Sequence, residues 1–402
     1  MTQSIRFGTD GVRGHAGQWP VSVDGAKAIG MGLSRWIKQG TVFVGRDTRA
    51  SSPQLVDALV DGLVTGGAHA VRLGVVPTAA VSTAVVADGA DAGVMVTASH
   101  NVWSDNGIKV VDRRGEKLVD PSELAAHFGV PASSSGGTDS THPSPLDSWF
   151  QALPSVDLSG HRILLDGAHG AGAAAAADAL RRMGALVTEV ANSPNGRNIN
   201  DGVGAMHPPL DLHGCDLGIC LDGDGDRLVL IHPRRGILDG DDLLWMLSRT
   251  SRGPVVGTVM CNGGLEDALA GRLVRTAVGD ANVHAEMRRL NAEIGGEPSG
   301  HIMIRGGMPT SDGLYTALRI LASQGSNELP IGGWSRWPQA KRNVRNVEAC
   351  TTLDAIHEAE KSGHRVLVRA SGTESLVRIM VEGQDADRWA KAIEDALVRQ
   401  MG

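Results

Sequence analysis

Residues 94–110 read VMVTASHNVWSDNGIKV, and the expected fold of the N-terminal part is built around this stretch. Its apolar start, preceded by Gly93, predicts a buried strand. The small polar residues 97–101 end the strand and predict a loop. Because a hydroxyl lies beside an imidazole here, at Ser99 and His100, the loop is a candidate nucleophile site. Taken alone, the loop is better explained as a surface turn, and the other motifs of the chain are what favour the nucleophile site.

Strands and helices alternate on both sides of this stretch, which predicts an α/β fold. Apolar runs predict strands at residues 41–44, 71–76, 162–166, 217–221, 255–259, 365–369 and 376–381, and helices at 53–63, 173–182, 265–273 and from 385 onward. A run rich in Ser, Gly and Pro, residues 130–145, predicts a linker. We therefore expect three α/β domains, at 1–140, 141–239 and 240–328, and a smaller C-terminal α+β domain at 329–402.

Composition restricts the class of protein. The chain has 402 residues, 42% of them hydrophobic, and a net charge of -7, which argues against nucleic acid or an anionic membrane as the main partner. Its four cysteines form no zinc-binding pattern and predict free thiols in a reducing compartment. No signal segment or membrane span is evident. We expect a cytoplasmic protein.

Three carboxylates alternate with glycines after a predicted strand, at Asp222, Asp224 and Asp226. Glycines allow the backbone to fold tightly, so the carboxylates can converge on one hard cation, and Mg²⁺ fits such a set. An acidic turn is the alternative. A calcium loop is excluded because Pro233 stands where the closing Glu would be. Arg227 follows directly and could pair with a phosphate.

Three further motifs offer anion or hydroxyl contacts. Residues 369–374 read RASGTE, with two hydroxyls, a glycine and Arg369, and Arg378 follows. Such a set can hold a phosphate, although a hairpin with solvated charges reads the same way. Residues 295–301 read GGEPSGH and could bind sugar hydroxyls or form an ordinary turn. Residues 7–14 read FGTDGVRG and contribute a cation at Arg13.

Serine hydrolysis is the obvious competing chemistry for Ser99. The Gly-x-Ser-x-Gly pattern is absent, since Thr97 and Asn101 occupy the outer positions. A P-loop pattern is also absent. A serine accompanied by a metal loop and a phosphate-binding loop indicates phosphoryl transfer.

These motifs together resemble those of the α-D-phosphohexomutases, most closely the bacterial phosphoglucosamine mutases. TASHN with DNGIK resembles the phosphoserine loop, DGDGDR the metal loop, GEPSGH the sugar loop and RASGTE the phosphate loop. They occur in family order over nearly the whole chain. The resemblance implies three related α/β domains and a C-terminal phosphate-binding domain around a central cleft.

The resemblance also implies a role for each motif residue. Ser99 would carry the phosphoryl group and complete the ligands of Mg²⁺ held by the three aspartates. Lys109, with His100 and Arg13, would handle protons and stabilise charge. Substrate contacts are expected from Arg227, Glu297, Ser299, His301, Arg369, Ser371, Gly372, Thr373 and Arg378.

The implied activity is the interconversion of glucosamine 6-phosphate and glucosamine 1-phosphate, by a monomer or homodimer. A hexosamine or glucose 1,6-bisphosphate would phosphorylate the serine. Alternatives are a phosphomannomutase/phosphoglucomutase or a specialised paralogue, a metal-dependent phosphatase, and a sugar-phosphate sensor. The chain departs from the pattern at Ala281, where the branch has Arg. We expect Arg288, His284, Arg289 or Arg305 to supply that charge.

Overall fold

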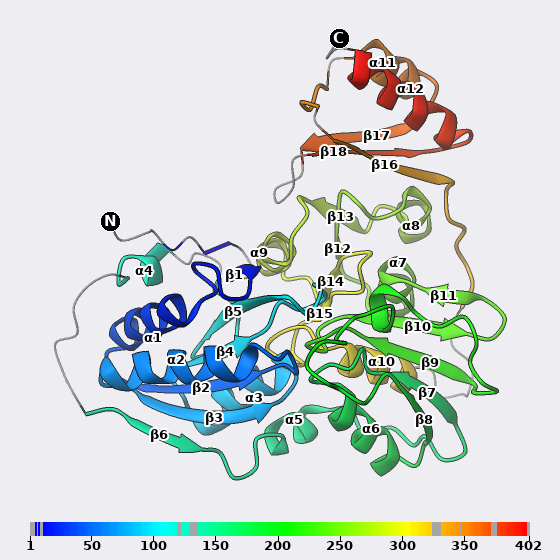
Figure 1. The fold of residues 1–402 in the computed structure, drawn as a ribbon. Helices are drawn as coiled ribbons and strands as arrows, with labels where there is room; N and C mark the ends of the chain where they lie inside the picture. The colour runs from blue at the N-terminus through cyan, green and yellow to red at the C-terminus, as the bar shows by residue number, and fades with distance from the viewer. Residues whose placement is uncertain are drawn as a thin grey trace. The chain divides into compact units, whose positions relative to one another are not determined.

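The structure is a computed structural model of the chain. It describes residues 5, 7–8, 11–118, 122–128, 136–323, 331–345, 347–351, 353–370 and 376–399. Its internal contacts divide it into a larger unit, residues 1–259 and 274–331, and a smaller unit, residues 260–273 and 332–402. We describe each unit separately. The expected α/β class is confirmed, because helices alternate with the strands of four sheets (Figure 1).

The first sheet of the larger unit has six strands in the order β1-β5-β4-β2-β3-β6. The strands are β1 (Val12–His15), β2 (Thr41–Arg46), β3 (His69–Val75), β4 (Ala92–Val96), β5 (Asp105–Asp112) and β6 (Thr138–Thr141). The associated helices are α1 (Val23–Trp36), α2 (Ser52–Thr65), α3 (Thr78–Asp88), α4 (Ser122–Ala125) and α5 (Asp147–Ala152). Strand β4 lies in the middle, between β2 and β5, so the end of β4 is a central position in the domain.

The two faces of this sheet are covered by different helices. Val94 and Val96 of β4 belong to the core that includes α1 and α2, and α1 and α2 pack against each other (Figure 1). On the opposite face Gly93 admits α3, since a Cβ there would lie 2.8 Å from the side chains of Val81 and Val85. Successive side chains of β4 point to opposite faces of the sheet, and all five residues are buried, so β4 is covered on both faces.

A second sheet has the order β11-β10-β9-β7-β8, with a parallel part and an antiparallel part. The strands are β7 (Arg162–Asp166), β8 (Leu186–Val190), β9 (Leu217–Leu221), β10 (Leu228–His232) and β11 (Gly236–Leu238), with helix α6 (Ala173–Arg182) and the short 3-10 helix η1 (Gly204–Met206). All residues of β9 are buried. The aspartate motif begins directly after β9.

A third sheet has the order β13-β12-β14-β15. The strands are β12 (Val255–Thr258), β13 (Leu273–Thr276), β14 (Ile294–Gly296) and β15 (Ile302–Ile304), with helices α7 (Gly240–Ser248), α9 (Asp280–Leu290) and α10 (Gly313–Ala322). Helix α10 also packs on β9 and β10, so it joins the second and third sheets.

The smaller unit has one antiparallel sheet in the order β16-β18-β17. Its elements are α8 (Gly263–Leu269), β16 (Gln339–Arg345), α11 (Asp354–Lys361), β17 (Arg365–Ala370), β18 (Leu376–Glu382) and α12 (Ala386–Arg399). Its apolar core includes residues of both sheet and helices, among them Ile379 and Ile393. The predicted helix 265–273 is too long, because Ala270 adopts a left-handed backbone (φ 49°) and ends α8.

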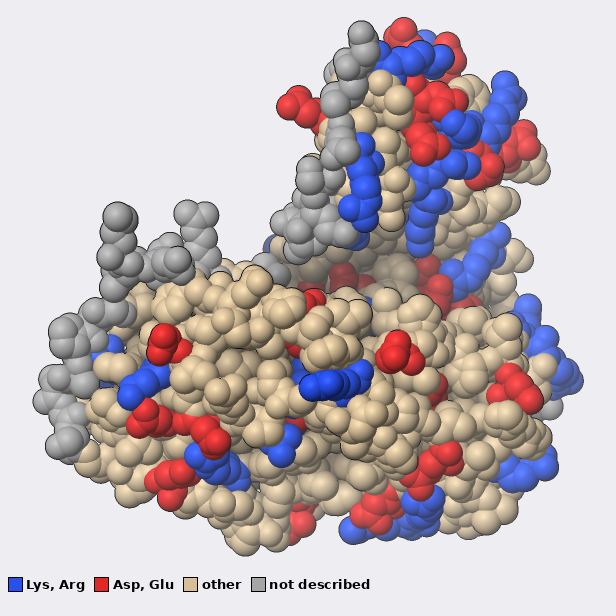
Figure 2. Space-filling model, in the orientation of Figure 1, with Lys and Arg blue, Asp and Glu red and all other residues tan. Residues whose placement is uncertain are grey.

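The predicted linker is partly a strand. Residues 138–141 form β6, which pairs in parallel with β3 at the edge of the first sheet, while residues 129–135 lie outside the described residues. All four residues of β6 are exposed. Acidic and basic side chains are interspersed over the visible face of the larger unit (Figure 2). Within the described part of the chain, no helix has the length and apolar character needed to span a membrane.

Candidate active site

Ser99 lies in the loop that follows β4, and its backbone is unusual. The residue is 1% exposed and has φ 52°, in the left-handed region that non-glycine residues rarely adopt. Its Oγ donates a hydrogen bond to Asp222 Oδ2 at 2.6 Å, and its N–H donates to Thr97 Oγ1 at 2.9 Å. His100 Nδ1 lies 3.5 Å from Ser99 Oγ. The structure therefore joins the serine loop to the aspartate motif.

The three aspartates converge after β9. One carboxylate oxygen of each lies within 4.8 Å of the others, and all three side chains are buried. Burial and the charges of Asp226 and Asp224 raise the pKa of Asp222 to about 7. Asp224 Oδ1 and Asp226 Oδ1 are buried and accept no hydrogen bond from the described residues. Such an all-oxygen, acceptor-only set fits Mg²⁺.

Two neighbours bear on the charge of this cluster. Lys109 of β5 donates through Nζ to Asp224 Oδ2 at 2.7 Å and to Asp226 Oδ2 at 3.0 Å. Arg13 of β1 pairs in register with Gly107 of β5. Burial, followed by the positive charges of Arg227 and Arg13, lowers the pKa of His100 to about 3. His100 is therefore neutral near pH 7 and a weak base, whereas Lys109 and Arg13 supply positive charge.

The sugar-loop motif packs directly on the metal-loop motif. The backbones of His301 and Arg227 form an isolated antiparallel β-bridge. The side-chain Nε2 of His301 lies 3.5 Å from Asp226 Oδ2. A Cβ at Gly300 (φ 87°) would lie 2.1 Å from Leu228 O, so only glycine allows this approach. The backbone N–H of Arg227 donates to Asp222 Oδ1 at 3.2 Å. The two motifs thus form one structural unit.

Glu297 and Ser299 are less enclosed than His301. Glu297 follows β14 and its Oε1 accepts a hydrogen bond from Gly279 N at 2.9 Å. Ser299 is exposed in the turn. The sugar loop is therefore fixed by its backbone and by His301, while Ser299 presents its side chain to solvent.

The predicted phosphate-binding residues belong to the smaller unit. Arg369 of β17 lies directly opposite Arg378 of β18, and Arg378 is exposed. Residues directly opposite each other on antiparallel strands lie on the same face of the sheet, where one phosphate could contact both guanidinium groups. Ser371, Gly372 and Thr373 lie outside the described residues.

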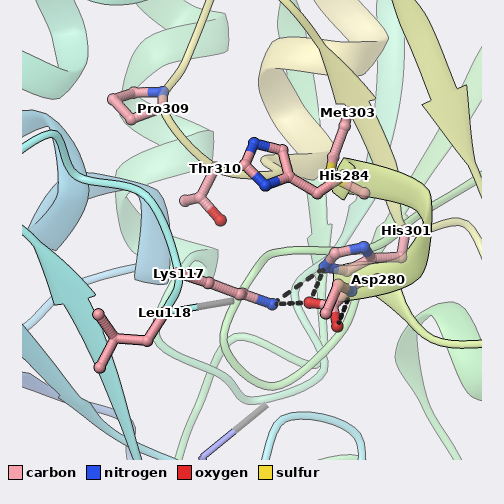
Figure 3. Close-up of a pocket in the computed structure, with 9 residues that line it drawn as sticks. Lys117, Leu118, Asp280, His284, His301, Met303, Pro309 and Thr310 are labelled. Atoms are coloured by element: carbon pink, nitrogen blue, oxygen red, sulfur yellow. Dashed lines mark hydrogen bonds and ion pairs between the residues drawn. The ribbon is translucent and has the colours of Figure 1, made fainter. Parts of the chain in front are cut away.

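The sequence did not indicate Lys117, which lies beside the aspartate cluster. Its Nζ forms an ion pair with Asp280 at the start of α9, and lies 3.4 Å from His301 Nε2 and 3.9 Å from Asp226 Oδ2. Figure 3 shows Lys117, Asp280 and His301 turned toward one another in a pocket. The pocket is partly open to solvent and is also lined by Leu118, Ala281, His284, Met303, Pro309 and Thr310.

The expected replacements for an arginine at Ala281 differ in their positions. Arg288 lies 3.4 Å from Glu116, Arg289 pairs with Glu286, and Arg305 donates to Asn291. His284 does line the pocket with Ala281, and burial lowers its pKa. Lys117 places its ammonium group in the same pocket. The sequence could have indicated Lys117 by its position shortly after β5, the strand that carries Lys109.

A buried serine beside an aspartate triad, with the Lys117–Asp280 ion pair in the adjoining pocket, can now be compared with known proteins. Three family models match the chain: phosphoglucomutase/phosphomannomutase α/β/α domain I over residues 4–127, domain III over 239–331 and the C-terminal domain over 336–400. The chain belongs to the phosphoglucomutase/phosphomannomutase family.

The relatives most similar in sequence include proteins named phosphoglucosamine mutase. A phosphoglucosamine mutase of Agrobacterium fabrum is 38% identical, covering 97% of this chain and 96% of the relative. One of Roseobacter denitrificans is 36% identical, covering 97% of each chain. Among solved structures, a phosphoglucomutase/phosphomannomutase family protein of Burkholderia thailandensis has a TM-score of 0.77 at 23% identity, covering 98% of this chain and 96% of that one.

A solved fungal enzyme shares the fold at lower similarity. N-acetylphosphoglucosamine mutase of Aspergillus fumigatus, in complex with GlcNAc-6P and magnesium, has a TM-score of 0.62 at 18% identity. It covers 89% of this chain and 82% of that one.

Proposed function

We propose that the chain is a phosphoglucosamine mutase, an isomerase of carbohydrate metabolism that interconverts glucosamine 6-phosphate and glucosamine 1-phosphate. The observation that carries the proposal is the 2.6 Å hydrogen bond from Ser99 Oγ to Asp222, within a buried carboxylate triad. The relatives named phosphoglucosamine mutase, which match nearly the full chain, support the choice of substrate.

The transfer proceeds through phosphorylated Ser99. The bond between phosphorus and Ser99 Oγ breaks as a bond forms between phosphorus and O1 of glucosamine 6-phosphate. The O1 proton passes to a neighbouring base, and Oγ takes up a proton. The bisphosphate then reorients in the site, so that its 6-phosphoryl group faces Ser99. This group moves to Ser99 Oγ by the same exchange of bonds. Glucosamine 1-phosphate is then released.

The residues around Ser99 suit this exchange. Asp222, Asp224 and Asp226, with the phosphorylated Ser99, would hold Mg²⁺, which when bound neutralises charge on the phosphoryl oxygens. Lys109 lies against two of these carboxylates and supplies positive charge at the reacting group. Lys109, with His100 beside Ser99 Oγ and Arg13 nearby, would assist the proton movements.

Substrate binding is assigned to three motifs. Glu297, Ser299 and His301 bind sugar hydroxyls, and Arg227 contacts the phosphoryl group. Arg369, Ser371, Gly372, Thr373 and Arg378 hold the phosphate that is not reacting. Because either end of the sugar reacts in turn, the same residues must accept both the 1-phosphate and the 6-phosphate.

Other expectations complete the proposal. A hexosamine or glucose 1,6-bisphosphate phosphorylates Ser99 in the first turnover. The enzyme is a cytoplasmic monomer or homodimer, and small phosphosugars, not nucleic acid or membrane, are its partners. The four domains span residues 1–140, 141–239, 240–328 and 329–402.

One substrate panel tests the function. The purified protein with Mg²⁺ and glucose 1,6-bisphosphate is assayed on glucosamine, glucose and mannose 6-phosphates, with 1-phosphate formation and free phosphate both measured. We expect the highest kcat/KM with glucosamine 6-phosphate. A preference for glucose or mannose would identify a phosphoglucomutase/phosphomannomutase. Release of free phosphate would identify a phosphatase, and binding without turnover a sensor.

A further inference from the structure

Arg49, in the turn before α2, has a fully buried side chain. It donates hydrogen bonds to Asp47 and to backbone carbonyls in and next to the serine loop. Nε donates to Asp47 Oδ2 at 2.8 Å. Nη2 donates to the carbonyl oxygens of Ser99 at 2.9 Å and Asn101 at 2.8 Å. Nη1 donates to Asp105 O at 3.0 Å and also to Val102 O. One guanidinium thus binds three carbonyls of the serine loop and the carbonyl of the first residue of β5.

Asn200 supplies a second donor to the same carbonyls from a different part of the chain. It precedes η1 in the second domain, and its Nδ2 donates to Ser99 O at 2.8 Å and to Asn101 O at 3.1 Å. Asn200 is 8% exposed and itself has a left-handed backbone (φ 58°). Its backbone N–H donates to Ala168 O at 3.0 Å, which fixes it to the loop after β7.

The serine loop needs such support because of its conformation. A left-handed backbone at serine is strained and persists only where its surroundings fix it. Gly223 of the metal loop closes the third side, since a Cβ there would lie 2.6 Å from Ser99 O and 2.8 Å from Asn200 Nδ2. The carbonyl of Ser99 is therefore enclosed while its Oγ is directed at Asp222.

We propose that Arg49 and Asn200 are positioning residues for phosphoryl transfer, which hold the Ser99 carbonyl and thereby aim Oγ at the aspartate triad. This inference rests on the proposed function of the site. Neither side chain contacts Ser99 Oγ, so both act through the backbone of the loop. Asn200 also makes the geometry of Ser99 depend on the loops of the second domain.

A purely structural role for Arg49 is the alternative explanation. Asp47 Oδ1 accepts hydrogen bonds from Arg49 N at 3.0 Å and Ser52 Oγ at 2.7 Å, so the Arg49–Asp47 pair also fixes the start of α2. That role would lower thermal stability but leave kcat per folded molecule unchanged. The positioning role lowers kcat in folded enzyme.

The test compares Arg49→Lys and Asn200→Ala with two matched controls. Arg46→Lys changes an arginine three residues away that donates to Asp47 O, and Asn198→Ala changes an asparagine of the same loop that donates to Ser193 O. Steady-state kcat and KM, the single-turnover rate of Ser99 phosphorylation by glucose 1,6-bisphosphate, and Tm are measured for each.

We expect kcat and the phosphorylation rate to fall on the order of 10²-fold in Arg49→Lys, since small misplacement of a reacting group has effects of this size. In Asn200→Ala both should fall about 10-fold, since two neutral hydrogen bonds to the loop are lost while those of Arg49 remain. KM should change little. The double variant should lose less than the product of the single losses, because both donors hold the same carbonyls. The controls should keep the wild-type kcat.

Amide hydrogen exchange of residues 97–106 gives a readout that does not depend on activity, and it should be faster in both variants. Wild-type kcat and exchange in Asn200→Ala would overturn the proposal, even if Arg49→Lys failed to fold. A Ser99→Ala protein that retained turnover would instead refute the proposed function, so the two failures are distinguishable.

Discussion

The serine site of the larger unit and the arginine pair of the smaller unit arrange their charges in opposite ways. At the serine site, three carboxylates and Lys109 are buried together, and opposite charges lie within 3.0 Å. In the smaller unit, Arg369 and exposed Arg378 face each other as like charges across two strands. The first arrangement fixes its charged groups away from solvent, which is the preorganisation that the proposed phosphoryl transfer requires. The second places two cations on one sheet, where the proposed function assigns the phosphate that is not reacting.

The largest effect should follow from removing the nucleophile. Ser99→Ala leaves the triad and Lys109 in place but provides no oxygen for the phosphoryl group. Turnover should fall to background, while intact-mass measurement of wild-type protein should find one phosphoryl group on part of the population. Wild-type activity in Ser99→Ala would show that the buried site is not the reaction centre.

Changing the triad should have the next largest effect. Asp224→Asn removes one of the carboxylates proposed to hold Mg²⁺, and metal assistance contributes several kcal/mol. We expect kcat to fall about 10²-fold or more and the Mg²⁺ requirement to rise in a metal titration. Asp216→Asn, an exposed residue before β9 that pairs with Arg162, is the control. Full activity after chelation would rule out the metal role.

Replacing the arginines tests the other half of the comparison. Arg369→Gln or Arg378→Gln removes a charge-assisted contact of about 1.5–3 kcal/mol. The loss of kcat/KM should be similar with the 1-phosphate and the 6-phosphate. Arg342→Gln, on β16 of the same sheet and paired with Asp387 and Glu394, should change little. A defect confined to one substrate would contradict a shared phosphate site.

A smaller effect is expected in the pocket beside Ala281. Lys117→Met removes the ammonium group paired with Asp280 and should raise KM about 10-fold, the equivalent of one charge-assisted contact. Ala281→Arg should recover part of this loss in the Lys117→Met background but not in the wild type, where two cations would share the pocket. Arg288→Gln is the exposed control. A strong rise in turnover of Ala281→Arg in the wild-type background would show that Lys117 does not replace the positive charge of an arginine at position 281.

The smallest effect concerns stability and pH. Burial raises the pKa of Asp312, the N-cap of α10, to about 6, although Tyr315 N and Trp149 Nε1 both donate to it. The folded state therefore holds this proton more tightly than the unfolded state. Its contribution to stability is complete below about pH 4 and is lost as pH rises through 6.

Asp312→Asn keeps an N-cap residue but removes the titration. The slope of Tm between pH 4 and 6 should become less negative than in the wild type. An unchanged slope would show that Asp312 does not titrate in this range.

Much of the fold could be predicted because its signals are local. The strands 162–166 and 217–221 and the helix 173–182 have the predicted bounds, since apolar periodicity and flanking glycines mark them. β6 was missed, because the residues Thr-Asp-Ser-Thr have no apolar pattern. Its strand conformation comes from pairing with β3, which no local signal encodes.

The residues of the candidate site also fall into two groups, those in linear motifs and those that only long-range contacts define. Ser99 and the three aspartates belong to linear motifs, so the sequence indicated them, and the structure brings them together. Lys117, Arg49 and Asn200 act through contacts with residues 50 to 184 positions away, which only the fold defines. Helical spacing placed Arg288 on the face of Ala281, but Arg288 lies beside Glu116, which a single helix could not reveal.

The left-handed backbone at Ser99 also limits which hydroxyl amino acid can occupy the position. Threonine offers the same nucleophilic atom, yet a β-branched residue in this region is a true outlier. A hydroxyl-for-hydroxyl exchange at Ser99 is therefore not a conservative change. Asparagine and aspartate, which tolerate the conformation, would preserve the shape of the loop while removing its nucleophile. Backbone geometry alone thus favours serine over threonine at this position.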